Sequence, residues 1–320
     1  MTLAKKIISK ELDEFEVHFR EAVRSRVPLL DRIMQYIVKR KGKQLRPMFV
    51  LLSAKLGGEI SERSYRAASL VELLHTATLV HDDVVDEADE RRGFFSINAL
   101  WKNKIAVIVG DYLLSKGLLL SLNNQDHLIL QILSDAIKLM SEGELLQLEK
   151  ARKLNLDELI YYEIIKGKTA SLLAACCAAG AASTFEDAVA IEKMRLFGEK
   201  VGMAFQIKDD LFDYGTENVG KPTGNDIKEK KLTLPLIHVL NNCDKTTRKK
   251  IIYIVKNENT QKDKVAFVID AVTKGGGIDY ATKKMFEFRD EALSILHEFE
   301  PSDTRKALEE LVRYTTDRAY

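Results

Sequence analysis

The sequence predicts an all-α protein, a single large helical domain over residues 1–320. Three observations carry this prediction. Apolar residues recur at spacings of three, four and seven along most of the chain, which is typical of helices that bury one face. Alternating apolar and polar runs bounded by turn residues, which would indicate strands, are hard to find. No segment rich in proline, glycine or serine divides the chain, which favours one domain over two.

The order of the helices follows from capping residues and apolar periodicity. The clearest helix begins after Ser61, a good N-cap, and places Ala67, Leu70, Leu74 and Ala77 on one face. It is expected to be long and buried and to carry aspartates on its last turns. Further helices are expected at residues 3–24, 29–39, 44–56, 97–122, 126–149, 157–182, 185–213, 232–241, 246–256, 261–273, 278–298 and 302–316.

The composition is that of a globular protein, with 46% apolar residues, 30% charged residues and a net charge of +1. This balance lacks the basic excess of a general nucleic-acid binder, so no nucleic-acid partner is expected. No transmembrane segment or secretion signal is expected, because no run reaches roughly 18 apolar residues. Cys176, Cys177 and Cys243 form no metal-binding or disulfide pattern. The sequence therefore favours a cytoplasmic location with unreactive thiols.

The stretch HDDVVDEADERRG, residues 81–93, crowds carboxylates at the end of the long buried helix. Asp82 and Asp86 are four residues apart, so on a helix they share one face with roughly 5–6 Å between Cβ atoms, where like charges repel. A solvated helix end is the simple explanation. A bound divalent cation is the alternative.

The stretch GMAFQIKDDLFDYG repeats this spacing with Asp209, Asp210 and Asp213, again after an apolar helical segment. Two DDxxD clusters, each ending a buried helix, favour paired metal sites over solvated faces. Magnesium prefers oxygen ligands and is typically bound by one or two carboxylates together with substrate phosphates. The two clusters therefore predict that several Mg²⁺ ions hold a polyphosphate.

Basic motifs accompany the acidic clusters. Arginine binds phosphate oxygens through two parallel hydrogen bonds, whereas lysine acts as a point charge. The candidates for an anion site are Lys43 and Arg46 in GKQLRP, the pair Arg91 and Arg92, Lys168 and Thr169 in GKT, and Lys221 and Lys231 in GKPTGNDIKEKK.

The run LLAACCAAGAA, residues 172–182, consists of small and apolar residues. Small side chains let neighbouring helices pack closely, and they also leave volume for an elongated cavity. The sequence leaves both interpretations open.

Five segments resemble the trans-isoprenyl diphosphate synthases, in their long-chain polyprenyl branch. They are GKQLRP, LLHTATLVHDDVVDEADERRG, GKTASLL, FQIKDDLFDYG and GKPTGNDIKEKKLTLPLI. The resemblance spans about residues 42–237. It implies an isoprenoid synthase fold of roughly a dozen helices around a central cavity, usually in a homodimer. It also implies head-to-tail addition of isopentenyl diphosphate to an allylic diphosphate, with farnesyl or geranylgeranyl diphosphate as the expected starter.

The resemblance assigns roles to single residues. The implied Mg²⁺ ligands are Asp82, Asp86 and Asp209. Their motif partners, which bind the metal directly or through water, are Asp83, Asp210 and Asp213. The implied isopentenyl diphosphate site consists of Lys43, Arg46, His75 and Arg92. The implied allylic diphosphate site consists of Arg91, Lys168, Thr169, Gln206 and Lys231, with Lys221 as a weaker candidate. Gln44 departs from the family pattern, which often has a basic residue there.

The expected product is a long all-trans polyprenyl diphosphate for quinone side chains, with octaprenyl diphosphate expected within C30 to C40. In the family, bulky aromatic residues four or five positions before the first aspartate accompany short products, and Thr78 and Ala77 stand there instead. By resemblance, the departing diphosphate accepts the proton at the end of the reaction, and the product is handed to a membrane. A short-chain C15 to C20 synthase stays an alternative.

Three other interpretations compete. A terpene cyclase shares the helical architecture but normally lacks a second DDxxD cluster. An HD-type phosphohydrolase would explain the pair His81 and Asp82, but the other histidines form no ligand pattern. A non-catalytic subunit of a heterodimer would be expected to lose one aspartate cluster, and both are complete here.

Overall fold

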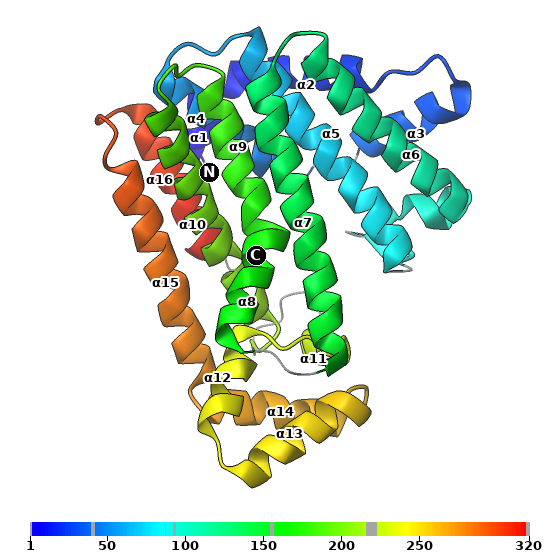
Figure 1. The fold of residues 1–320 in the computed structure, drawn as a ribbon, viewed down its shortest axis with the longest axis vertical. Coiled ribbons are helices and arrows are strands. Elements are labelled where there is room, and N and C mark those ends of the chain that lie inside the picture. Colours follow the sequence, from blue (N-terminus) through cyan, green and yellow to red (C-terminus); the bar gives the residue numbers. More distant parts are fainter. Residues whose placement is uncertain are drawn as a thin grey trace. The chain divides into compact units, whose positions relative to one another are not determined.

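A computed structural model describes residues 2–39, 42–86, 88–91, 94–153, 157–215 and 223–317, with the backbone alone for Arg91, Arg152 and Lys153. The part of the chain that it describes is built almost entirely of helices (Figure 1). These are α1 (Thr2–Ile7), α2 (Ser9–Val23), α3 (Pro28–Val38), α4 (Leu45–Gly57), α5 (Glu62–Val85), α6 (Ile97–Leu122), α7 (His127–Lys153), α8 (Glu158–Ile165), α9 (Ser171–Ala182), α10 (Ala188–Phe212), α11 (Asn225–Lys228), α12 (Leu234–Asn242), α13 (Lys245–Asn257), α14 (Lys262–Lys274), α15 (Gly277–Leu296) and α16 (Asp303–Asp317).

The all-α prediction is confirmed, and most expected helices appear with ends shifted by a few residues. Five features were not expected. The expected helix 3–24 is divided at Ile8 into α1 and α2, and the expected helix 97–122 is kinked at Lys102, whose φ is 73°. The segment 157–182 is interrupted by a π-turn, η1 (Lys166–Ala170). A short antiparallel pair, β1 (Glu90–Arg91) and β2 (Phe94–Phe95), follows the first acidic cluster. The short helix α11 lies in the segment after the second cluster.

The chain forms two compact units. The first comprises Met1–Asp135, Ala175–Arg195 and Ser302–Leu308, and the second comprises Ala136–Ala174, Leu196–Pro301 and Glu309–Tyr320. The first aspartate cluster belongs to the first unit, and the second cluster belongs to the second unit.

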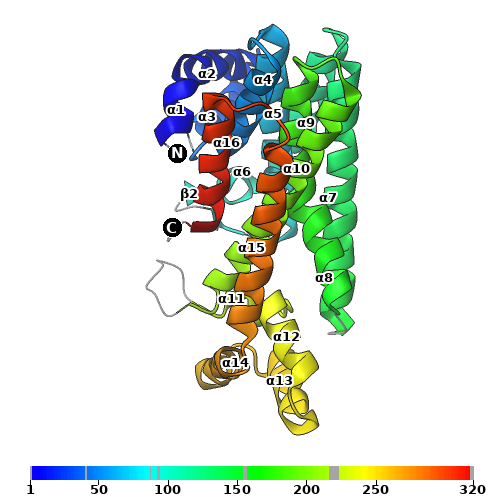
Figure 2. The same ribbon diagram turned by 90° about the vertical axis from the view of Figure 1, so that its left-hand side faces the viewer.

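In the first unit α5 packs against α2, α4 and α6 (Figures 1 and 2). A capping box between Ser61 and Ser64 begins α5, and it satisfies backbone amides that the first turn leaves without partners. Near the other end, His81 lies directly against Gly110 of α6, where a Cβ would come within 2.1 Å of the imidazole Nε2. Glycine therefore lets α6 approach the end of α5 that carries the first aspartates.

In the second unit the core includes apolar residues of α8, α10 and α12 to α15. Figures 1 and 2 both show α13 and α14 beside α12. The π-turn η1 lies against α7 and α10 at glycines. A Cβ on Gly143 of α7 would be 2.8 Å from the Lys168 amide nitrogen, and one on Gly202 of α10 would be 2.5 Å from the Ala170 Cα.

Replacing Gly143 with alanine is expected to lower the free energy of unfolding by roughly 1–3 kcal/mol, because the new methyl group meets backbone that cannot rotate away. Gly117→Ala in α6 is the matched control, since a Cβ there meets the flexible side chains of Leu70 and Leu74. Urea denaturation of both variants measures the difference. Equal stability of the two variants would show that the crossing at Gly143 has room to relax.

Candidate functional site

The first aspartate cluster lies on the last turn of α5. Asp83 is buried, Asp82 is half-buried, and Asp86 is the exposed C-cap residue. The Asp86 backbone N–H donates to the Asp82 carbonyl at 2.8 Å, so the two residues are held one helical turn apart. The C-terminal end of a helix carries partial negative charge, which disfavours each added carboxylate by about 0.3–1 kcal/mol. A bound cation would offset this repulsion.

His81, next to the cluster, connects α5 to α6. Its Nε2 lies 3.2 Å from the Val107 carbonyl oxygen and 3.6 Å from the Asp111 carboxylate. The imidazole is therefore engaged in holding the helix end, as expected for a residue with a structural role rather than a metal ligand.

The second aspartate cluster lies at the end of α10 and repeats this arrangement. Asp209 is half-buried, Asp210 is buried, and Asp213 follows in the turn after the helix. The Asp213 carboxylate accepts hydrogen bonds from the backbone N–H groups of Asn225 at 2.7 Å and Asp226 at 3.1 Å. Asp213 therefore organises the segment around α11, which brings Asp226 to the site.

Asp210 has a different environment. One carboxylate oxygen accepts from the Tyr161 hydroxyl at 2.7 Å, and the other accepts from the Gln206 amide at 2.8 Å. The Gln206 carbonyl in turn accepts from the Thr169 hydroxyl at 2.7 Å. The predicted residues Thr169, Gln206 and Asp210 are thus joined in one hydrogen-bonded chain.

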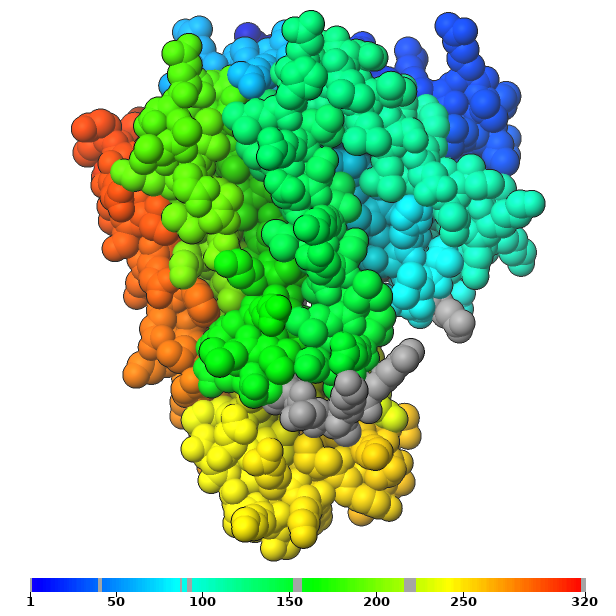
Figure 3. Space-filling view, in the orientation of Figure 1, coloured from blue at the N-terminus to red at the C-terminus, as the bar shows by residue number. Residues whose placement is uncertain are grey.

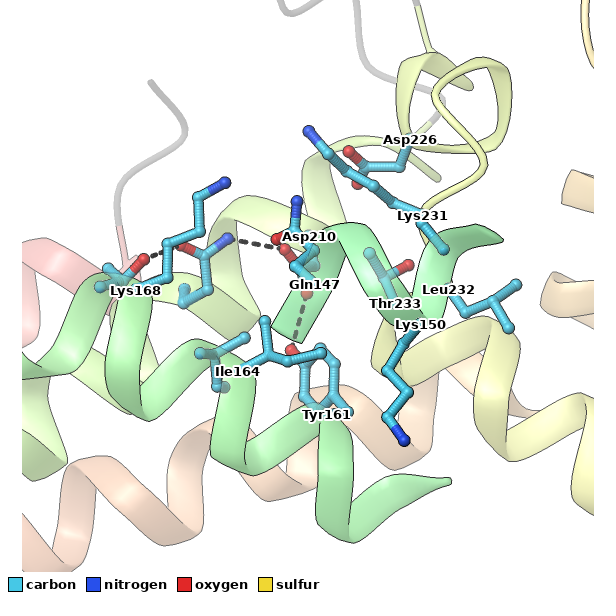
Figure 4. A pocket seen from close by; sticks show the side chains of 14 residues that line it. Gln147, Lys150, Tyr161, Ile164, Lys168, Asp210, Asp226, Lys231, Leu232 and Thr233 are labelled. Atoms are coloured by element: carbon cyan, nitrogen blue, oxygen red, sulfur yellow. Dashed lines mark hydrogen bonds between the residues drawn. The ribbon is translucent and has the colours of Figure 1, made fainter. Parts of the chain in front are cut away.

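A cavity of about 130 Å³ opens beside this chain of hydrogen bonds (Figure 4). In this view Asp210 lies between Lys168 on one side and Asp226 with Lys231 on the other. The cavity is lined by Gln147, Lys150, Ala151, Tyr161, Ile164, Ile165, Lys168, Thr169, Gln206, Asp210, Asp226, Lys231, Leu232 and Thr233. Three ammonium groups and two carboxylates on one small cavity match a site for an anion together with a cation.

The carboxylates in and around this cavity repel each other, and this repulsion adds to the cost of burying them. Burial and then the charge of Asp226 raise the pKa of Asp210 to about 7. Burial and then the charge of Asp213 raise the pKa of Asp226 to about 7. A divalent cation would remove the penalty that burial and mutual repulsion place on the ionised carboxylates.

The donor set fits Mg²⁺, which takes oxygen ligands and keeps water and substrate phosphates in its coordination shell. Within the described residues, no three acidic, histidine or cysteine side chains converge into a preformed metal cage. Carboxylates of either aspartate cluster would therefore hold Mg²⁺ together with the phosphates of a substrate rather than alone.

Two cations of the cavity are ion-paired within the protein. Lys168 of η1 contacts Glu144 of α7, and Lys231 contacts Glu229. These partially exposed pairs contribute little to stability, so an incoming phosphate can replace the carboxylates at low cost. Lys221 lies outside the described residues.

The predicted isopentenyl diphosphate residues lie in the first unit. The Arg46 guanidinium of α4 donates to the Glu72 carboxylate of α5 at 2.8 and 3.4 Å. Glu72 and His75 are three residues apart, so they share a face of α5 with Arg46 beside it. Lys43 is exposed just before α4, at the same end of the helix as Arg46. Arg91 contributes its backbone to β1, and Arg92 lies outside the described residues.

The two predicted chain-length residues differ in their surroundings. Ala77 is fully buried in an apolar cluster of the first unit that includes Leu73, Val80 and Val109. Thr78 is half-buried, and its hydroxyl donates to the His75 carbonyl oxygen at 2.9 Å. Close packing thus accounts for the small residue at Ala77, and the role of both residues in product length stays a prediction.

The sequence did not predict five polar residues of the cavity, namely Gln147, Lys150, Tyr161, Asp226 and Thr233. Asp226 stands inside GKPTGNDIKEKK, whose basic residues predict an anion site rather than a carboxylate. Gln147 and Lys150 follow Glu144 at helical spacing, which places them on the face of α7 that meets Lys168. Tyr161 gave no signal, because a tyrosine in an apolar helical run is ordinarily a core residue.

Comparisons with known proteins identify the family of the chain. The sequence matches the family model described as "Polyprenyl synthetase" over residues 27–272. The all-trans-nonaprenyl-diphosphate synthase (geranyl-diphosphate specific) of Rhodobacter capsulatus is 35% identical over 97% of this chain and 96% of that protein.

Solved structures resemble the chain over its whole length. A decaprenyl diphosphate synthase from Rhodobacter capsulatus has a TM-score of 0.94 and 32% identity, covering 99% of this chain and 98% of that one. A geranylgeranyl pyrophosphate synthase from Bacteroides thetaiotaomicron has a TM-score of 0.84 and 36% identity, covering 99% of both chains. The expected isoprenoid synthase fold and the expected chain-elongating prenyltransferase class are confirmed. The chain therefore belongs to the polyprenyl synthetase family.

Proposed function

We propose that the protein condenses isopentenyl diphosphate head-to-tail with an allylic diphosphate, in the presence of Mg²⁺, to make an all-trans polyprenyl diphosphate of C30 to C40. Octaprenyl diphosphate is the expected product, and farnesyl or geranylgeranyl diphosphate is the expected starter. One observation carries the proposal furthest. The buried Asp210 of the second aspartate cluster and the half-buried Asp226, both with raised pKa values, share a cavity with three lysines.

The residues of the chain bind and orient two diphosphates. Lys168 and Lys231, with Thr169 and Gln206, bind the allylic diphosphate, whereas Lys43, Arg46 and Arg92 bind isopentenyl diphosphate. Asp82, Asp86 and Asp209 would hold Mg²⁺, which supplies positive charge that stabilises the leaving diphosphate. Binding both substrates in one protein makes their encounter effectively intramolecular.

The reaction exchanges one C–O bond for one C–C bond. The allylic C–O bond breaks with its electron pair on the diphosphate, and the double bond of isopentenyl diphosphate forms the new C–C bond with the allylic cation. A proton then leaves the condensed cation, and the departed diphosphate accepts it. Lysine and arginine side chains stabilise the diphosphate while its charge develops. Apolar walls exclude water, which would convert the cation into an alcohol.

The test is incubation of the purified protein with Mg²⁺, isopentenyl diphosphate and each of dimethylallyl, geranyl, farnesyl and geranylgeranyl diphosphates. We expect products of C30 to C40 on chromatographic sizing. Formation of an alcohol or a cyclic hydrocarbon without chain elongation would contradict the proposal.

A short-chain product is the second candidate function. It is favoured by the 36% identity with the geranylgeranyl pyrophosphate synthase, which is as high as the identity with long-chain relatives. The same sizing experiment separates the two candidates, since a short-chain enzyme stops at C15 or C20 even with excess isopentenyl diphosphate.

Lys43→Ala is expected to raise the KM for isopentenyl diphosphate about tenfold, because one charge-assisted hydrogen bond to phosphate is lost. The KM for the allylic substrate should change much less, and Arg92→Ala should behave in the same way. Lys10→Ala is the control, since Lys10 is an exposed residue of α2 in a surface ion pair with Glu14. Steady-state kinetics with each substrate varied in turn provides the measurement. A rise confined to the allylic KM would reverse the assignment of the two subsites.

A homodimer forms part of the proposal and is supported by the exposed face of α6. Val107, Ile108, Leu118, Leu119 and Leu122 are exposed there, and Figure 3 shows the outer side of α6 open toward the viewer. The stretch Asn103–Leu122 even has the length and hydropathy of a membrane span, which sequence analysis did not expect, with 33% of it buried. The second such stretch, Glu158–Ala182, is 72% buried and is a core segment.

An apolar stripe on one helix face of a water-soluble enzyme indicates a surface that another protein covers. Replacing Ile108 with aspartate is expected to convert the dimer into monomers, because it places a charge in the middle of the apolar contact. Light scattering on a gel-filtration column measures the molar mass. Lys249→Asp, at an exposed position of α13, is the control. A monomeric wild-type protein would exclude the homodimer.

The proposal also places the enzyme in the cytoplasm as a single domain, with its product passed to a membrane. The state of the thiols agrees with a reducing compartment. All three cysteines are free, and burial raises the pKa of Cys177 to about 12, which keeps the thiol protonated and unreactive.

A further inference from the structure

Tyr161 occupies an unusual place between the apolar core and the second aspartate cluster. Its side chain is 3% exposed and packs in the core of the second unit with Leu232, Leu234 and Leu236. Its hydroxyl is directed out of this core into the cavity, where it donates to Asp210 (Figure 4). Burial raises the Tyr161 pKa well above its ordinary value, so the phenol keeps its proton and acts as the donor.

Asp210 receives hydrogen bonds on both carboxylate oxygens. The Tyr161 hydroxyl holds Oδ2, and the Gln206 amide holds Oδ1. A carboxylate that two donors orient in this way lies in one fixed position, because rotation about its Cβ–Cγ bond would break both hydrogen bonds. Asp209, its neighbour on α10, belongs to the same helical turn.

The contacts of Asp210 link three elements that carry the site. Tyr161 comes from α8, Thr169 from η1 and Gln206 from α10. The series from the Thr169 hydroxyl through Gln206 to Asp210, and from there to the Tyr161 hydroxyl, contains hydrogen bonds of 2.7, 2.8 and 2.7 Å. The turn that presents Lys168 and the turn that presents Asp209 are therefore tied to a common anchor.

We propose that Tyr161 is a positioning residue for the reaction, which holds Asp210 as an anchor so that Asp209 faces the metal and Lys168 faces the diphosphate. Asp210 then does not bind the metal itself but fixes the helical turn that carries Asp209. Asp209 is the metal ligand of the second cluster. This inference rests on the proposed function, because it assigns a role within the binding of Mg²⁺ and diphosphate.

The neighbouring residue Tyr162 provides a matched control. It lies on the same helix, and its hydroxyl donates to Glu158 at 2.9 Å, one turn back along α8. Its ring contacts the Tyr161 ring edge-to-face at 5.5 Å between centroids. Tyr162→Phe thus removes the same chemical group from the same helix without touching Asp210.

The experiment measures binding of inorganic diphosphate in the presence of Mg²⁺ by isothermal titration calorimetry, which needs no turnover. We expect Tyr161→Phe to weaken this binding about tenfold, with a higher Mg²⁺ requirement, while Tyr162→Phe binds like wild type. Circular dichroism and thermal unfolding should be nearly the same for both variants. Equal binding by both variants, or an equal loss in both, would overturn the inference.

A second pair of variants tests the role of Asp210 even if Tyr161→Phe folds poorly. Asp210→Asn retains an oxygen that accepts from Tyr161, so we expect it to weaken Mg²⁺-dependent diphosphate binding less than Asp209→Asn does. A greater loss in Asp210→Asn would make Asp210 the metal ligand and overturn the inference. Wild-type protein that binds Mg²⁺ and diphosphate but shows no chain elongation would refute the proposed function separately.

Discussion

Replacing Asp82 or Asp209 by alanine is expected to lower turnover by about 10²–10³-fold, the size of effect seen when a group that stabilises developing charge is removed. Each carboxylate stands on the last turn of its helix, α5 or α10, where the helix itself disfavours negative charge. Removing one of them therefore costs the fold little, and helix content should stay unchanged. Turnover at saturating substrates and circular dichroism provide the two measurements.

Asp135→Ala and Asp270→Ala serve as controls, because both are exposed aspartates on helices away from the acidic clusters. Each control should keep nearly full activity. Raising the Mg²⁺ concentration should recover part of the activity of the Asp82 and Asp209 variants. If either of these variants were folded and nearly as active as wild type, the reaction would not require both clusters.

Replacing Thr78 or Ala77 by phenylalanine is expected to shorten the product from C30–C40 to C15 or C20. Each helical turn advances about 5.4 Å, so an aromatic ring one turn before Asp82 would stop a chain that grows along α5. Ala77 is fully buried, and Ala77→Phe overpacks the apolar cluster at a cost of typically 1–3 kcal/mol. Thr78 is half-buried, so Thr78→Phe is the variant that is expected to stay stable.

Leu79→Phe is the matched control, since residue 79 lies about 100° further round the helix than Thr78. Products are sized by chromatography, with condensation activity and thermal unfolding measured on the same samples. A folded, active Thr78→Phe enzyme that still makes chains of wild-type length would place the end of the product cavity elsewhere.

Helix positions were predictable from the sequence because apolar spacing and capping residues are features of neighbouring residues in the chain. The apolar spacing that predicted a helix at 97–122 recurs in α6, and a good N-cap at Ser61 marks the start of α5. The interruption of 157–182 by η1 had no such local signal, and the glycines that lie against it, Gly143 and Gly202, come from other helices. Close contacts between helices are visible only after the chain has folded.

The residues of the candidate site likewise fall into two groups, those that the sequence predicts and those that only the folded chain brings together. Carboxylates at DDxxD spacing show their chemistry in the sequence, and the family resemblance then implies that Asp82, Asp86 and Asp209 are the metal ligands. The partners that orient such groups leave no pattern. Tyr161 lies far from Asp210 in the sequence, and their contact arises from the packing of α8 on α10.

The π-turn η1 also fixes the number of residues that the chain needs between α8 and α9. A π-turn contains one residue more than an α-helical turn, so it shifts the phase of the helix that follows. Leu173 and Ala174, just after the π-turn, lie in close contact with Gly198, where a Cβ would be 2.5 Å from the Leu173 carbonyl oxygen. Deleting one residue from Lys166–Ala170 would rotate the beginning of α9 by about 100° and separate these surfaces. Chimaeric enzymes that exchange α8 or α9 with a relative must therefore keep the residue count of this turn, even where its sequence varies.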